Sequence, residues 1–309
     1  MRKSRHVVTF FALLAVCSLH ADEAGPDSVN AEFSQGITLD AATSREAQLS
    51  YSAAWHIGLG GEGVLTHGNS VDIELRGTVS PVSGSSGVHV VLTPLSVLQL
   101  QAGSTIGSGW YLAPLDVNGL GVLENQHENR YSQNAFDGFV WEASAGGALQ
   151  FDTAAIIPGM WSSVLMRSYH GVEWDFYSRA NGEPWEYRGA QDRVNGWSYT
   201  TESILAYQLP AFPMLRLVGV LYETETLLSM RNSARVAEGA WGSDFVAIDV
   251  AGLAVFDVAP RHTLVCLLQW SRNQNWINEE TGLTLRELNP DTPGEWEFWR
   301  VALSYSYAF

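Results

Sequence analysis

The chain lacks most of the features that mark cytosolic enzymes and helical membrane proteins. It has two cysteines, and only 16% of its 309 residues are charged. After Leu19 it contains no continuously apolar stretch of about 18 residues, so no membrane-spanning helix is expected. Disorder is also excluded, because 46% of the residues are apolar and disordered chains combine low hydrophobicity with high net charge. A soluble β protein or a β-barrel remains.

Basic residues are scarce, with 17 Lys and Arg against 33 Asp and Glu and a formal net charge of −16. Without a basic stripe to neutralise phosphates, nucleic-acid binding is not expected. Beyond the N-terminal region the chain carries a single cysteine, Cys266. An internal disulfide and a cysteine-based metal site are therefore not expected, and Cys266 is predicted to be a small apolar residue on a strand.

The first residues predict a secretory signal peptide over residues 1–21. Basic residues at Arg2, Lys3 and Arg5 precede the apolar run Val7–Leu19, and Ala21 offers a small residue at the cleavage point. A short periplasmic segment, 22–32, would follow. An alternative is lipidation of Cys17, although the bulky Val16 stands where a lipoprotein box prefers a small residue.

The C-terminal segment alternates with a period of two, as a strand with one apolar face does. The apolar parity holds Trp299, Val301, Leu303, Tyr305, Tyr307 and Phe309, and the other parity holds Arg300, Ala302, Ser304, Ser306 and Ala308. This segment resembles the terminal strand of bacterial outer-membrane β-barrels. The resemblance implies that Tyr305, Tyr307 and Phe309 form the assembly signal, with the barrel-assembly machinery and outer-membrane lipid as partners. Segments 93–110 and 299–309 are also similar to uncharacterised spirochaetal outer-membrane barrels.

Other segments show the same alternation, which a transmembrane barrel requires because each strand faces lipid on one side and the lumen on the other. The apolar parities include Leu49, Tyr51 and Trp55; Val71, Ile73 and Leu75; Trp141, Ala143 and Leu149; Val164, Met166, Val172 and Trp174; Tyr199, Leu205 and Tyr207; and Val218, Val220 and Tyr222. Leu217 and Leu221 then point inward, against the trend.

Short and long connections alternate along the chain. Tight, proline-containing turns are predicted at 157–159, 210–213 and 259–260, with a fourth at Thr93-Pro94-Leu95, and long polar connections lie near 112–137, 179–193, 231–240 and 277–295. Residues 83–87 read as a short outer loop or a bulge. The predicted fold is all-β: a transmembrane antiparallel up-and-down barrel over residues 33–309, with both termini periplasmic. It has twelve strands if Phe33–Leu39 crosses, with ten as the alternative.

Tryptophans cluster near the long-connection ends of the predicted strands, where the aromatic girdle of a membrane barrel belongs. They are Trp110, Trp141, Trp174, Trp197, Trp241, Trp270, Trp276, Trp296 and Trp299.

Charged residues on the inward parity are the main candidates for functional residues, and acids outnumber arginines among them. The candidates are Asp72, Glu74, Arg76, Glu142, Asp152, Arg167, Glu173, Asp175, Glu202, Glu223, Glu225, Asp249 and Arg300. They either line a water-filled passage and favour cations, or form a polar core that only satisfies itself. The apolar segment Tyr111–Leu123 is expected to fold into the mouth as a constriction.

The function predicted from these patterns is a narrow passive channel for small or weakly cationic solutes. A closed structural or surface-recognition barrel is the alternative, and an outer-membrane hydrolase the third candidate. His170 falls on the lipid-facing parity and Asp175 on the other, which disfavours a catalytic pair there. His127 with Glu124 and Glu128 is either a base or metal cluster or a solvated loop. No cofactor is expected, because the glycine string Gly58–Gly63 leads into a strand rather than a helix.

Overall fold

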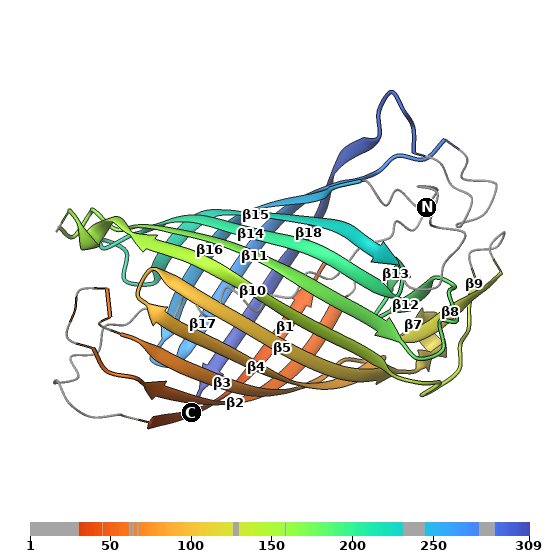
Figure 1. Ribbon diagram of the computed structural model, residues 1–309, viewed down its shortest axis with the longest axis horizontal. Coiled ribbons are helices and arrows are strands. Elements are labelled where there is room, and N and C mark those ends of the chain that lie inside the picture. The colour runs from red at the N-terminus through yellow and green to blue at the C-terminus, as the bar shows by residue number, and fades with distance from the viewer. Residues whose placement is uncertain are drawn as a thin grey trace.

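The chain forms a closed barrel of twelve antiparallel strands in the computed structural model (Figure 1). The prediction of twelve strands is confirmed, because the strand that decides between ten and twelve is present over Ala31–Ala42. It begins two residues before the predicted boundary at Phe33. The predicted signal peptide lies outside the described residues. Those residues are 31–44, 46–61, 63, 65–66, 68–125, 130–157, 159–230, 245–277 and 288–309.

Each barrel strand pairs with its neighbour in the chain, and the first pairs with the last to close the cylinder. At the closing seam Gly36 lies opposite Ala308, and Ala42 lies opposite Ala302. Within the described part of the chain, no helix is long and apolar enough to cross a membrane. The barrel strands are β1 (Ala31–Ala42), β2 (Glu46–Gly58), β3 (Ser70–Val79), β4 (Ser83–Leu95), β5 (Leu98–Gly109), β10 (Val140–Asp152), β11 (Val164–Tyr177), β14 (Gly196–Gln208), β15 (Leu215–Met230), β16 (Ala247–Ala259), β17 (His262–Gln274) and β18 (Gly294–Ala308).

The two ends of the barrel differ in their connections. One end, here called the turn end, holds the connections β10–β11, β14–β15 and β16–β17 together with Phe309. The last two connections are short, but the tight turn predicted at 157–159 is wrong, because residues 153–163 join β10 to β11. The opposite end, the loop end, holds the long connections β5–β10, β11–β14, β15–β16 and β17–β18. The predicted alternation of short and long connections is therefore present from β5 onward. Earlier in the chain it fails, because residues 43–45 and 80–82 form short connections at the loop end.

Two local predictions before residue 100 were wrong. Residues 83–87 are neither a loop nor a bulge, since they begin β4, pair with β5 from Ser83 and pair with β3 from Gly84. Serine and glycine at these positions suggested a turn, but pairing on both sides outweighs their low strand propensity. The turn assigned to Thr93-Pro94-Leu95 lies just beyond it, at Ser96 and Val97, and Pro94 sits in a register shift between Leu92 and Leu95.

The outer face of the barrel is an apolar band with aromatic side chains at both of its ends. Near the loop end the rings of Trp174 and Trp197 lie 5.0 Å apart, and near the turn end those of Phe33 and Trp55 lie 5.2 Å apart. The sequence analysis identified only the loop-end belt, and its member Trp241 lies outside the described residues. Between the belts, exposed apolar residues include Leu75, Val88, Leu100, Leu149, Met166, Leu205, Val220 and Leu268.

Tyr169 packs flat against two inward-facing glycines on β10 and β11. A Cβ atom added at Gly171 would lie 2.2 Å from the Tyr169 hydroxyl, and one added at Gly146 would lie 2.6 Å from the same atom. We predict that Gly171→Val displaces this ring and destabilises the barrel by about 1–3 kcal/mol. The effect is measured as the urea concentration at which half of the protein loses the gel mobility of the folded barrel. Gly252→Val is the matched control, because nothing lies within 4 Å of its added Cβ; an equal loss in both variants would contradict the prediction.

Candidate functional site

The strand registers place the predicted lumen residues on the inner face, at the parity opposite the exposed apolar band. Glu202 is opposite Glu223, which is opposite Asp249, and Glu142 is opposite Asp175. The remaining candidates occupy the same parity of their strands: Asp72, Glu74, Arg76, Asp152, Arg167, Glu173, Glu225 and Arg300.

A small four-stranded sheet crosses part of the loop end of the barrel (Figure 1, right). We call it the mouth sheet; its order is β13-β12-β8-β9, with β8 (Leu120–Asn125), β9 (Arg130–Tyr131), β12 (Trp185–Tyr187) and β13 (Ala190–Arg193). It is built from two connections, β5–β10 and β11–β14. The predicted constriction at Tyr111–Leu123 supplies β6 (Tyr111–Leu112), the short helix η1 (Ala113–Leu115), β7 (Val117–Asn118) and part of β8. The second connection was predicted only as a polar loop.

Local sequence explains why the second connection folds back as a hairpin. Arg188 and Gly189 both have positive φ, at 54° and 80°, which is the requirement of a two-residue type I′ turn. The aromatic residues before the turn are almost fully buried, with Trp185 at 0% and Tyr187 at 2% exposure. They pack with Leu120, Val140 and Tyr177. The sheet is therefore a packed structure rather than a solvated loop.

Glycine allows the mouth sheet to approach the barrel rim closely. A Cβ atom at Gly119 would lie 1.7 Å from the backbone oxygen of Val82, in the β3–β4 connection. Only glycine permits this contact. On the other side of the sheet, Tyr131 donates a hydrogen bond to Asp192 at 2.8 Å. Burial, together with the charge of Asp192, raises the pKa of Tyr131, so its hydroxyl remains a donor.

Arg193 fastens the mouth sheet to the barrel wall. Its Nη2 atom lies 2.8 Å from Glu142 Oε1 on β10 and 2.9 Å from Asp175 Oδ1 on β11. The guanidinium also lies over the Trp185 ring, 4.7 Å from its centroid. Burial alone would lower the pKa of Arg193, but Asp175 and Glu142 raise it above the ordinary arginine value, so the residue stays charged. Two predicted lumen acids thus act as anchors.

A second arginine of the hairpin fastens its other end, because Arg188 donates to Ser85 on the inner face of β4. The sequence analysis named neither arginine. Both lie in a long connection, where charged residues usually remain in solvent, and the positive-φ pair Arg188-Gly189 was the available signal for the hairpin.

The inner face of β14, β15 and β16 carries a row of three carboxylates, from Glu202, Glu223 and Asp249. Directly opposite like charges destabilise a sheet unless water or counter-charges screen them. Arg167 pairs with Glu202 at one end of the row. Arg300, on β18, binds Gln269 and Glu46. The row gathers three acids at neighbouring positions of the inner face.

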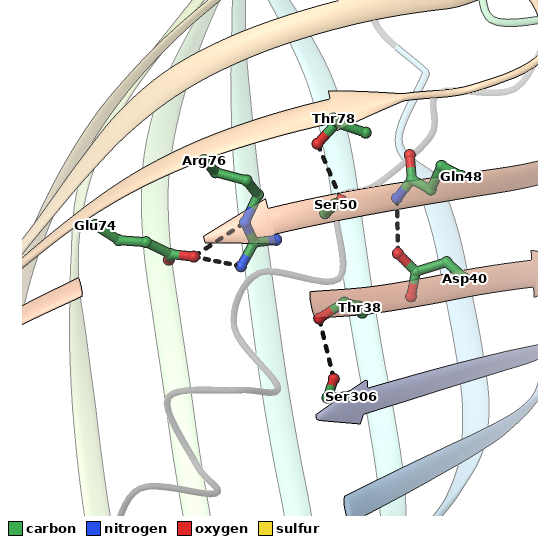
Figure 2. A network of polar contacts seen from close by, with 8 residues as sticks. All are labelled: Thr38, Asp40, Gln48, Ser50, Glu74, Arg76, Thr78 and Ser306. Carbon is green, nitrogen blue, oxygen red and sulfur yellow. Dashed lines mark hydrogen bonds and ion pairs between the residues drawn. The ribbon is translucent and has the colours of Figure 1, made fainter. Parts of the chain in front are cut away.

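One side of the lumen is lined by small polar side chains that bond to one another along the wall, as Figure 2 shows. We call this side, from β18 through β1 and β2 to β3, the polar wall. Thr38 contacts Ser306 at 3.1 Å, Gln48 donates to Asp40 at 2.9 Å, and Ser50 contacts Thr78 at 3.0 Å. Arg76 binds Glu74 on its own strand. These bonds join neighbouring positions, so the side chains lie along the wall.

The opposite side of the lumen is filled. On β11 and β14–β17 the inward residues near the turn end form a buried apolar cluster, which includes the sequence exceptions Leu217 and Leu221. Glu202, Glu223 and Gln269 on this side are buried as well. The other large members of the cluster are Leu165, Ile204, Leu253, Val255, Val265 and Leu267.

The arrangement closest to a nucleophile and base lies outside the lumen. Ser168 Oγ is 3.3 Å from His170 Nε2, and His170 Nδ1 is 2.7 Å from the Tyr199 hydroxyl. Ser168 and His170 occupy outward positions four or more residues from Trp174, roughly 10 Å into the apolar band. Lipid esters lie nearer the aromatic belt, which makes this site a poor one for ester hydrolysis.

The residues proposed as a metal or base cluster lie only partly within the described chain. His127 and Glu128 are outside it. Among the described residues, no group of three or more His, Cys, Asp or Glu side chains could hold a metal ion. At the turn end His56 Nδ1 contacts Asp72 Oδ1 at 2.6 Å, and Ser70 donates to the other Asp72 oxygen. The serine bonds to the acid and not to the imidazole, so this trio does not match a relay of nucleophile, base and orienting acid.

Arg193 gives a direct test of the mouth sheet. We predict that Arg193→Ala leaves Glu142 and Asp175 unpaired and loosens the β12–β13 hairpin, because removing one partner of a buried ion pair costs about 3–5 kcal/mol. Chymotrypsin should then cut the connection 178–195 at least several-fold faster in the folded barrel. Arg179→Ala is the control, since that side chain is exposed and 3.3 Å from Asp137. Equal cleavage rates in the two variants would show that Arg193 does not hold the sheet.

Comparison with known proteins bears on the fold alone. No protein-family model matches the sequence, and no curated protein matches it. Similar solved structures include a NanC porin, 8% identical over 88% of this chain and 98% of that chain with a TM-score of 0.39. OmpT of Vibrio cholerae is 7% identical over 93% and 99% of the two chains, with a TM-score of 0.34. An anion-selective porin from Comamonas acidovorans is 7% identical over 91% and 100%, with a TM-score of 0.31.

Proposed function

We propose that the chain is an outer-membrane barrel that forms a narrow passive channel for small, weakly cationic solutes, without a catalytic step. Its position in a membrane is supported by the exposed apolar band between two aromatic belts and by the closed sheet. The predicted signal peptide and the terminal strand ending in Tyr305, Tyr307 and Phe309 support the outer membrane, with both chain ends on the periplasmic side.

The polar wall is the observation that carries the channel proposal. A barrel of twelve strands is intermediate in size between barrels filled by side chains and barrels with a wide aqueous channel. Here the filling is one-sided, because buried apolar and charged residues occupy the β14–β17 side. Thr38, Asp40 and Gln48 on the polar wall are only partly buried and bond sideways, whereas Ser50 is buried. We infer a hydrated path along that wall.

The mouth sheet narrows this path, and its described residues contact the barrel on one part of the circumference. Its contacts with the barrel are to β4, β5, β10, β11 and β15, through Arg188, Tyr187, Arg193 and the cluster of Leu123 with Leu227. The polar wall lies on the remaining part of the circumference. The sheet would therefore act as a constriction that limits solute size.

The proposed cation preference rests on the greater number of acids than arginines on the inner face. Arg167 and Arg193 are each engaged by acids, and the acids on the inner face still outnumber the arginines. A lumen with low-dielectric walls focuses such a potential and concentrates counter-ions. The overall formal charge of −16 has the same sign.

Planar-bilayer recording tests the channel. We predict small stepwise conductances and a cation-biased reversal potential, with the bias reduced in the double variant Glu223→Gln, Asp249→Asn. A carboxylate about 10 Å from a passing cation, across the lumen from the path, contributes about 0.4 kcal/mol in water, or about twofold in ion preference. The control Asp291→Asn changes an exposed acid in a loop. Folded protein that inserts but stays silent would contradict the proposal, and unchanged selectivity would remove these two carboxylates from it.

A second candidate function is surface recognition through the mouth sheet. The observation that favours it is that two loop segments pack into a sheet, with Trp185 and Tyr187 buried at its base. Because of this packing, the outward-facing surface of the loops has a fixed shape that a partner could recognise. Silent but well-folded barrels in the bilayer experiment would favour this function over the channel.

A further inference from the structure

The outer face of β11, β14 and β15 carries a polar patch in the middle of the apolar band. The registers place Ser168 opposite Ser203, His170 opposite Thr201, and Thr201 opposite Thr224, all on outward positions. These five residues, here called the outer polar patch, are contiguous across three strands. They lie near the midpoints of β11 and β14, and so at mid-height in the wall.

Hydrogen bonds link the patch into a network. Ser168 Oγ lies 3.1 Å from Ser203 Oγ, and Thr201 Oγ1 lies 2.7 Å from Thr224 Oγ1. The His170 imidazole lies between Ser168 and Tyr199, bonding to one through each ring nitrogen. Each hydroxyl has one donor and two acceptor sites, so this network leaves acceptor capacity unused.

Apolar side chains surround the patch on every side. Leu149 on β10 is 64% exposed, Leu205 on β14 is 55% exposed and Val220 on β15 is 49% exposed. Toward the loop end the patch is bounded by Val172 and by the pair Trp174 and Trp197. Imidazole and hydroxyl groups at the centre of a hydrocarbon layer are costly, because lipid chains offer no hydrogen-bond partner.

We infer that the outer polar patch is the interface through which the barrel associates with a second copy of itself. The inference rests on the proposal that the barrel spans a membrane. Two copies inserted in the same direction are related by an axis along the membrane normal, so the patch of one copy meets the same patch of the other at equal height. An isologous contact needs groups that both donate and accept, and hydroxyls and a neutral imidazole do both.

The small size of the side chains in the patch also supports a second copy of the barrel as the partner. Association within membranes is driven by close packing of small residues and by hydrogen bonds between the surfaces, since burial from lipid gives no hydrophobic gain. The patch offers small side chains at Ser168, Thr201, Ser203 and Thr224, with Gly147 next to His170 on β10. Two walls can therefore approach closely at this site.

Single-cysteine crosslinking tests the interface. In the full chain with Cys17→Ser and Cys266→Ser, we expect Thr201→Cys to form a disulfide-linked dimer after refolding into liposomes and mild oxidation. The matched control is the chain with Cys17→Ser alone, which keeps Cys266 on the outward parity of β17, three strands away. The control keeps the patch but should form no disulfide-linked dimer. Crosslinking of Thr201→Cys no stronger than that of Cys266 would overturn the inference.

Energy transfer between labelled barrels gives a second measurement. Membrane-buried polar contacts average about 0.6 kcal/mol, or roughly threefold in association. We therefore expect Ser168→Ala with His170→Leu and Ser203→Ala to weaken association by roughly twentyfold while the folded gel mobility is kept. Undiminished association of this folded variant would also overturn the inference. Failure of the chain to insert at all would instead contradict the proposed function, whereas conducting barrels that remain monomeric would contradict only the interface.

Discussion

The whole structure depends on hydrogen-bonding every backbone group of the wall to another strand. In hydrocarbon an unpaired amide or carbonyl costs several kcal/mol, so a sheet can cross only if it closes on itself. Pairing of β1 with β18 closes the sheet, and Thr43 caps the end of that seam by exchanging hydrogen bonds with Val301. Once the sheet is closed, side-chain alternation determines the rest, because each strand must present one parity outside and the other inside.

The inward-facing side chains fill the lumen of this intermediate-sized barrel unevenly. Apolar residues fill one side near the turn end, carboxylates and arginines occupy the middle, and the mouth sheet covers part of the loop end. Arg193 connects two of these layers, since it belongs to the mouth sheet and binds Glu142 and Asp175 of the wall. The proposed channel would follow the polar wall, with the acids of β14, β15 and β16 on another part of the inner face.

The sequence predicted the parts of this structure that depend on periodicity. Strand number, the inward or outward parity of residues such as Glu223 and His170, and the proline turns at 210–213 and 259–260 follow from local patterns that lipid and lumen impose on every strand. It failed where pairing partners come from elsewhere in the chain. Residues 83–87 look like a turn until both neighbouring strands are known. Likewise, the partnership of β8 with β12 joins segments more than 60 residues apart, and no local pattern marks it.

The central claim is that alternate residues of each strand face lipid and lumen, and it can be tested on a single strand. Cysteines placed one at a time at positions 71–75 of β3, with Cys17 and Cys266 replaced by serine, would be labelled in liposomes with a membrane-impermeant maleimide and with a lipid-soluble quencher-bearing reagent. The account predicts strict alternation: positions 72 and 74 react with the water-soluble reagent, and positions 71, 73 and 75 with the lipid-soluble one. Uniform reactivity of all five with the water-soluble reagent would contradict it.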